Sequence, residues 1–177
     1  MKGTITASEF EELYRVTARD VFAYVRRRRT GDAEEIVAET YAVAWRRRNE
    51  MPPQMFRRAW LFGVARRLLV AASRQQQRET ALKRELTTLP IPEHDTATRA
   101  HTAQVMSAAL RRLPREQQEL LRLVAWEGLT PAELAVSLGV RPGTARVRLH
   151  RARRALASDI EVRSLVDGTA REPLSAQ

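Results

Sequence analysis

The stretch from Leu129 to Leu156, which reads LTPAELAVSLGVRPGTARVRLHRARRAL, constrains the fold more than any other part of the chain. Thr130 and Glu133 have the spacing of a capping box, which predicts that a helix begins there. Gly139 can supply the left-handed residue that a tight corner between two helices requires. The stretch therefore predicts a short helix, a tight turn and a second helix.

The second of these helices is expected to begin at Pro142 or Gly143 and to bury one face. Its apolar residues recur at helical spacing: Ala145, Leu149, Ala152 and Leu156. Its other faces carry Thr144, Arg146, Arg148, Arg151, Arg153 and Arg154. A basic helix of this kind fits the major groove of DNA, with its first residues near base edges and its arginines near phosphates. An ordinary helical hairpin with a basic solvent-facing side is the alternative interpretation.

The charge balance of the chain favours a polyanionic partner. The 177 residues include 31 Lys plus Arg against 21 Asp plus Glu, for a net charge of +10. Most of the basic residues are arginines, whose planar fork grips phosphates and guanine edges. This points to nucleic acid, although a GC-rich genome, which encodes arginine often, is a competing explanation.

The sequence also excludes several kinds of site. It contains no cysteine, so disulfides, thiol chemistry and cysteine-based zinc sites are excluded. It has no glycine-rich phosphate loop, HExxH pair or nucleophile elbow, so no catalytic residue, metal or cofactor is expected. No apolar run approaches the roughly 20 residues that span a bilayer, and the polar N-terminus lacks the apolar segment of a signal peptide. We therefore expect a soluble, cytoplasmic protein without membrane insertion.

Two more pairs with capping-box spacing, Ser8 with Glu11 and Asp32 with Glu35, predict helix starts in the first half of the chain. The first helix would turn five apolar side chains toward a core: Phe10, Leu13, Tyr14, Val21 and Val25. Two further helices are expected, from about Ala33 to Arg48 and from about Gln54 to Arg78. No strand pattern competes with them.

Apolar periodicity fades from about Gln75 to Ala100, which predicts a linker that is helical in part at its start. We therefore expect an all-α fold of two small helical domains joined by a linker. The expected boundaries are 8–78 for the first domain, 79–100 for the linker, 101–157 for the second domain and 158–177 for a weakly ordered tail.

The sequence from Leu110 to Leu156 resembles region 4 of the sigma-70 family of bacterial RNA polymerase sigma factors. The matching places include Glu133, Leu134, Ala135, Gly143, Thr144, Arg148, Arg151, Ala152 and Arg153. The resemblance implies that the helix-turn-helix from Pro131 to His150 binds the −35 promoter element. The residues implied in that contact are Arg141, Thr144, Arg146, Arg148 and Arg151. Response-regulator helix-turn-helix domains share much of this pattern, so region 4 alone leaves the class ambiguous.

The first half of the chain resembles sigma region 2. The residues Asp32 to Arg47, DAEEIVAETYAVAWRR, resemble region 2.2, and Phe56 to Arg74, FRRAWLFGVARRLLVAASR, resemble regions 2.3 and 2.4. From the length, regions 1.1 and 3 are expected to be absent, which is typical of the extracytoplasmic-function (ECF) subfamily. The resemblance implies binding to core RNA polymerase, at the clamp helices of its largest subunit and at its flap region. The residues implied in contact with the core are Asp32, Glu35, Ala38 and Glu39.

The resemblance also implies that the loop from about Asn49 to Met55 and the basic helix after it engage and melt the −10 element. The residues implied there are Asn49, Gln54, Phe56, Arg57, Arg58, Trp60, Arg66 and Arg67. Phe56, Trp60 and Phe62 alternate with arginines, as expected where bases stack on aromatic rings. Core packing is the competing explanation for Trp60, which falls on the apolar stripe.

The chain departs from the family pattern at several of these places. Ala38 replaces a common Gln, Arg67 replaces a common Asn, and Ala71 and Ala72 replace a step that usually contains Asp. The −10 preference therefore cannot be carried over. Arg141 stands where a Ser or Thr cap is usual, which either weakens the cap by about 1 kcal/mol or adds a phosphate contact.

The resemblance implies a sigma factor that directs promoter-specific initiation and that is held inactive by an anti-sigma factor. Two other functions stay open from the sequence. One is a helix-turn-helix regulator that acts without core polymerase, and the other is a small enzyme that processes nucleic acid. The acidic residues Asp32, Glu34, Glu35 and Glu39 could also be read as a metal site, although their helical spacing and capping role favour a protein-binding face.

Overall fold

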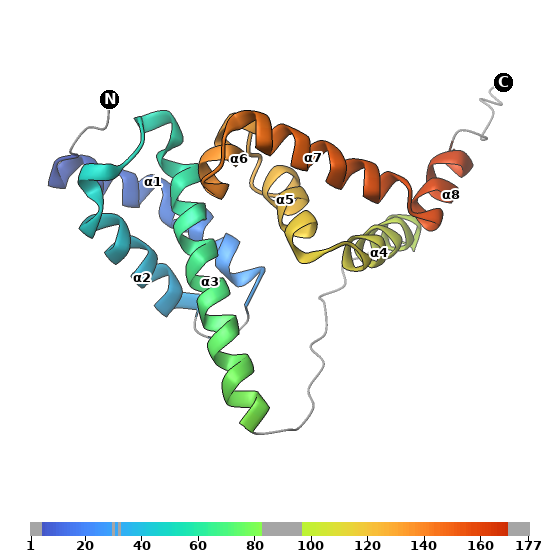
Figure 1. Cartoon of the computed structure of the whole chain (residues 1–177), viewed down its shortest axis with the longest axis horizontal. Helices are drawn as coiled ribbons and strands as arrows, with labels where there is room; N and C mark the ends of the chain where they lie inside the picture. Colours follow the sequence, from blue (N-terminus) through green and yellow to red (C-terminus); the bar gives the residue numbers. More distant parts are fainter. Residues whose placement is uncertain (1–4, 30, 32, 83–96, 170–177) are drawn as a thin grey trace. The chain divides into compact units, whose positions relative to one another are not determined.

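The computed structural model describes residues 5–29, 31, 33–82 and 97–169. All regular secondary structure in these ranges is helical, which confirms the predicted all-α class (Figure 1). The helices are α1 (Ala7–Arg26), α2 (Ala33–Arg46), η1 (Arg48–Glu50), η2 (Gln54–Phe56), α3 (Arg57–Leu82), α4 (Ala97–Arg112), α5 (Arg115–Ala125), α6 (Pro131–Leu138), α7 (Pro142–Ala157) and α8 (Ile160–Thr169).

The chain divides into two compact units, Met1–Thr87 with Glu127–Ala145 and Thr88–Trp126 with Arg146–Gln177. Helices α1, α2, α3 and α6 belong to the first unit, whereas α4, α5, α8 and most of α7 belong to the second. The domain boundaries expected from the sequence stay a prediction. The middle of the expected linker, residues 83–96, lies outside the described residues.

The core of the first unit is built by α1, α2 and α3. Tyr24 of α1 and Phe62 of α3 are fully buried, with ring centroids 5.0 Å apart. Helix α6 packs on α3 at Gly63, where a methyl group would lie 2.5 Å from the carbonyl oxygen of Ser137. Gly63 therefore permits an approach of the two helices that a larger residue would prevent.

Two of the predicted helix starts can be compared with the structure. The capping box of Thr130 and Glu133 is present, with the Thr130 amide donating to Glu133 Oε2 at 2.8 Å. In α1, however, the box is formed by Thr6 and Glu9, so the prediction of Ser8 and Glu11 was wrong. The two pairs have the same spacing, and the helix begins at the earlier one. Asp32 lies outside the described residues.

The turn between α6 and α7 is as predicted. Gly139 is the C-cap of α6 and adopts the left-handed conformation, with φ of 67°. Helix α7 then begins at Pro142, one of the two expected starts. A short helix, a left-handed glycine and a second helix thus follow one another as the sequence indicates.

The second unit contains one helix that the sequence analysis missed. Residues Ile160–Thr169 form α8, in a stretch expected to be a weakly ordered tail. Arg112 of α4 pairs with Asp159 at 3.0 Å and with Glu161 at 3.1 Å, and Val162 is buried. These contacts between α4 and the α8 end of the chain are long-range, so no local pattern in the sequence signalled them.

Candidate nucleic-acid and polymerase interfaces

Helix α7 presents a basic surface above a buried face. Ala145, Leu149 and Ala152 are at most 4 % exposed. The residues predicted to contact the −35 element all lie exposed: Arg141, Thr144, Arg146, Arg148 and Arg151. The helix thus combines the anchor and the charged surface that insertion into a major groove requires.

The structure adds information on two residues of this surface, Arg141 and Val147. The carbonyl oxygen of Arg141 accepts from the amide of Ala145 at 3.1 Å, which places Arg141 at the entrance to α7. Val147 was not named from the sequence, yet it is 51 % exposed among the arginines of α7. An exposed apolar side chain at such a place can contact the methyl group of thymine.

The residues predicted for the −10 element fall into two groups. Asn49, Gln54 and Arg67 are exposed, whereas Phe56, Arg57, Trp60 and Arg66 are half-buried. Partial desolvation and the neighbouring Arg47 and Arg66 lower the pKa of Arg67. Positive charge is therefore concentrated beside the start of α3, as binding of an anion requires.

Phe62, which alternates with arginines in the sequence, is fully buried against Tyr24. The expectation that it stacks on bases was therefore wrong, because it belongs to the core. Trp60 is only half-buried, so neither of the two interpretations offered for it is excluded by burial. The buried Nε atoms of Arg57 and Arg66 have no hydrogen-bond partner within the described ranges.

Helix α2 carries the residues predicted to contact core polymerase. Glu35, Ala38 and Glu39 are exposed, and Asp32 lies outside the described residues. Glu39 pairs with Arg46 at 2.5 Å on the same helix. Beside these residues is an open groove of about 520 Å³ between α2 and α3. It is lined by Arg29, Glu35, Ile36, Glu39, Leu68, Ala71, Ala72, Gln75 and Gln76.

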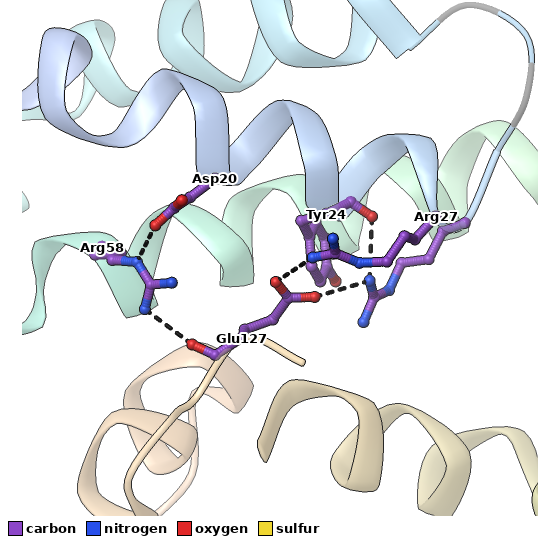
Figure 2. A network of polar contacts seen from close by, with 6 residues as sticks. Asp20, Tyr24, Arg27, Arg58 and Glu127 are labelled. Atoms are coloured by element: carbon purple, nitrogen blue, oxygen red, sulfur yellow. Dashed lines mark hydrogen bonds and ion pairs between the residues drawn. The ribbon is translucent and has the colours of Figure 1, made fainter. Parts of the chain in front are cut away.

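Arg58, predicted to bind DNA, is engaged within the protein (Figure 2). Its Nε donates to Asp20 Oδ2 at 2.7 Å, and its Nη1 donates to the carbonyl oxygen of Glu127 at 3.0 Å. The Glu127 carboxylate accepts from Arg27 at 2.5 Å and from Arg28 at 3.2 Å. The sequence did not predict this arginine–glutamate cluster, because Glu127 lies 100 residues from Arg27 and 99 from Arg28.

Other kinds of site find no support in the part of the chain that the structure describes. There, no three His, Cys, Asp or Glu side chains are placed to hold a metal ion. In the same residues, no helix is both long enough and apolar enough to cross a bilayer.

The fold and the basic surface of α7 define a helix-turn-helix DNA-binding protein. A family model described as "Sigma-70, region 4" matches residues 103–156. The chain is 33 % identical over 143 residues to the ECF RNA polymerase sigma factor SigF of Caulobacter vibrioides, covering 76 % of each chain. It is also 33 % identical over 137 residues to the ECF RNA polymerase sigma factor SigL of Mycobacterium tuberculosis, covering 73 % of this chain and 76 % of SigL.

The chain therefore belongs to the ECF RNA polymerase sigma factors. The match to SigF extends well beyond the region 4 match, so it includes sequence outside the helix-turn-helix. A helix-turn-helix regulator that acts without polymerase is accordingly not favoured.

A solved structure supports the fold. The sigma factor RpoE in complex with the anti-sigma factor NepR, from Bartonella quintana, aligns with a TM-score of 0.64 at 22 % identity. The alignment covers 85 % of this chain and 96 % of RpoE.

Proposed function

We propose that this protein binds core RNA polymerase and directs it to start transcription at particular promoters, with α7 at the −35 element and the start of α3 at the −10 element. The observation that carries the proposal is the exposed arginine surface of α7 above its buried face, in a chain that belongs to the ECF sigma factors. Membership of this family supplies the expectation of a polymerase partner.

At the −35 element, α7 would enter the major groove with its first turn toward the bases. Thr144 and Arg148 lie one turn apart on the exposed side of the helix, so both can reach base edges from one docking position. Arg141, Arg146 and Arg151 are also exposed and would hold the phosphates. Phosphate contacts fix the position of the helix, and base contacts select the sequence.

At the −10 element, the segment from Asn49 to Arg67 would hold separated strands. Trp60 and Phe56 are half-buried rather than sealed in the core, so an unpaired base can stack against what they expose. Arg57 and Arg66 are half-buried cations of the same segment, and Arg67 adds an exposed charge. This combination favours single-stranded DNA, whose phosphates and bases are both accessible.

Core polymerase would dock on α2. Glu35 and Glu39 give an acidic face to a chain with a net charge of +10, so this face is unlike the rest of the protein and unsuited to DNA. The groove beside it adds apolar contact area from Leu68, Ala71 and Ala72. An acidic and partly apolar face of this kind fits a protein partner, here the clamp helices of the largest subunit, while the flap region would bind the second unit.

Three further properties belong to the same proposal. The protein acts as a non-catalytic subunit, works in the cytoplasm with polymerase and is held inactive by an anti-sigma factor. Support for the last comes from RpoE, which was solved in complex with the anti-sigma factor NepR.

The proposal is tested by run-off transcription from a promoter library with core polymerase. The wild-type protein is expected to direct specific starts, and the double variant Glu35→Arg/Glu39→Arg is expected to fail while remaining folded. Glu11→Arg, which reverses an exposed charge on α1, is the control and should start transcription normally. A protein that binds DNA specifically but never associates with core would overturn the proposal in favour of an independent regulator.

A further inference from the structure

Glu127 has a buried carboxylate that is held by Arg27 and Arg28, the two residues directly after α1. Its side chain is 2 % exposed, and its carboxylate lies 2.5 Å from Arg27 and 3.2 Å from Arg28. Arg58 of α3 donates to its main-chain carbonyl at 3.0 Å. A buried carboxylate is costly unless it is paired in this way. Arg27 and Arg28 therefore already accommodate an anionic group, and Arg58 binds the main chain of the same residue.

Two of these guanidinium groups are positioned by aromatic rings. The Arg28 guanidinium carbon lies 3.7 Å from the centroid of the Tyr24 ring, and that of Arg58 lies 4.9 Å from the Phe62 ring. Both rings are fully buried. Because the rings belong to the core of α1 and α3, they would keep the arginines in place if Glu127 were removed.

We infer that Arg27, Arg28 and Arg58 form a binding site for backbone phosphate of promoter DNA, and that Glu127 occupies this site when DNA is absent. Guanidinium forks bind phosphate and carboxylate with the same bidentate geometry. The inference rests on the proposed function, because Arg58 lies in the first turns of α3, which that function assigns to the −10 element. Neither Arg27 nor Arg28 was identified as a DNA contact from the sequence.

Glu127 lies in the loop of residues 127–130 between α5 and α6, here called the Glu127 segment. Gly128, next to Glu127, has φ of 67°. Glycine reaches other backbone conformations at a lower cost than any other residue, so Glu127 can move while α6 stays packed on α3.

Competition follows from the geometry. The Nη1 of Arg58 donates to the carbonyl oxygen of Glu127, and its Nε donates to Asp20. A phosphate can therefore use Nη1 of Arg58 and the facing nitrogens of Arg27 and Arg28 only after the Glu127 segment moves away. Phosphate contacts do not depend on base sequence, so the competition can be measured with protein and DNA alone.

The first test is the affinity of the full-length protein for a fluorescein-labelled forked DNA, measured by anisotropy over a range of salt concentrations. Glu127→Gln removes the competing charge with little change in shape and is expected to bind several-fold more tightly than wild type. Glu116→Gln, which removes an exposed charge on α5, is the matched control and should change affinity little. If both variants bound DNA more tightly by the same factor, the change in net charge alone would explain the effect, and the inference would be overturned.

Loss of the arginines gives the complementary result. Arg28→Ala and Arg58→Ala are each expected to weaken binding several-fold and to reduce the slope of log affinity against log salt by about 0.9, the value for one phosphate contact in duplex DNA. Arg19→Ala, at an exposed position of α1, is the control and should leave the slope unchanged.

An exchange of charges separates a DNA contact from a purely structural role. Arg28→Glu alone is expected to lower the midpoint of thermal unfolding, and adding Glu127→Arg should restore it because the pair is re-formed. The double variant should nevertheless bind DNA as weakly as Arg28→Ala, since the cation now lies on the displaced segment. Recovery of DNA affinity along with stability would overturn the inference.

These outcomes are distinct from failure of the proposed function. The affinity measurements contain no polymerase, so competition at the arginines can be observed even if run-off transcription gives no specific start. In that case the phosphate site would stand and the sigma mechanism would fall. In the opposite case, transcription starts at specific promoters while neither Glu127→Gln nor the arginine variants change the affinity for DNA. The sigma mechanism would then stand, and the phosphate site would be ruled out.

Discussion

At the scale of single residues, Tyr41 shows how burial changes the chemistry of one side chain. It is 6 % exposed, and its hydroxyl lies 2.8 Å from that of Thr17. Burial raises the pKa of the Tyr41 phenol to about 12, against the smaller opposing effect of the Thr17 hydrogen bond. The neutral phenol is therefore the form that the folded protein accommodates.

This pKa predicts a loss of stability at high pH. Because the folded pKa lies above the unfolded value of 10.0, the stabilisation is fully present below pH 10 and is lost as the pH rises toward 12. The expected loss is about 3 kcal/mol of unfolding free energy, measured by urea denaturation at several pH values. Tyr41→Phe should remove this part of the pH dependence, and an identical pH profile in wild type and variant would contradict the assignment.

Gly63 gives a second prediction at this scale. A methyl group at this position would lie 2.5 Å from the Ser137 carbonyl oxygen, so Gly63→Ala should force α6 away from α3. We expect a loss of about 1–3 kcal/mol, the usual cost of overpacking, together with faster amide exchange in α6. Gly31→Ala is the control, because nothing lies within 4 Å of the added atom. Equal stability of the two variants would show that α6 tolerates the shift.

At the scale of helices, local signals predicted most of the elements. The Thr130 capping box and Gly139 fixed α6 and the turn after it, because both act through neighbouring backbone atoms. The start of α1 was misplaced because two overlapping residue pairs have capping spacing, and only the contacts of Thr6 with Glu9 decide between them. Local periodicity is therefore a good guide to helices and a weaker guide to their ends.

Sites that depend on distant residues were predicted less well. The arginine surface of α7 follows from helical spacing and was predicted residue by residue. In contrast, Glu127 is distant in sequence from Arg27 and Arg28, with which it forms ion pairs. No local sequence pattern around these residues predicts the contact. Phe62 was misjudged for the same reason, since its burial depends on Tyr24 of another helix.

Helix α8 yields a prediction with a matched pair of substitutions. Val162 is 6 % exposed, whereas Ile160 is 78 % exposed. Val162→Ser should therefore lower the unfolding free energy by about 1–2 kcal/mol because it removes buried apolar surface, and Ile160→Ser should have little effect. Urea denaturation measures both. A result in which the two variants were equally stable would mean that α8 contributes little to the second unit.

At the scale of the whole molecule, the net charge of +10 governs binding to DNA. Association is expected to weaken steeply with salt, because each phosphate that is neutralised releases counterions. The charges do not contribute equally, however, since those of α7 face the DNA in the proposed complex and those of α1 do not.

The corresponding prediction compares two pairs of arginines. Arg148→Ala/Arg151→Ala should reduce the slope of log affinity against log salt for a −35 duplex by about 0.9 for each phosphate that is no longer neutralised. Arg15→Ala/Arg19→Ala removes the same charge from exposed positions of α1 and should leave the slope nearly unchanged. Binding is measured by anisotropy between low and physiological salt. If both double variants changed the slope equally, the arginines of α7 would not contact the DNA more closely than those of α1.

The contact of Gly63 with Ser137 also restricts how the protein can evolve. The two positions are far apart in the sequence, yet the space at one sets the backbone position at the other. A larger residue at position 63 would destabilise the protein as long as α6 packs on α3 as it does here. Such a mutation must therefore follow or accompany a change around residue 137. Homologues in which α6 packs on α3 in this way are expected to keep glycine at position 63. Homologues without this packing should be free to vary at positions 63 and 137.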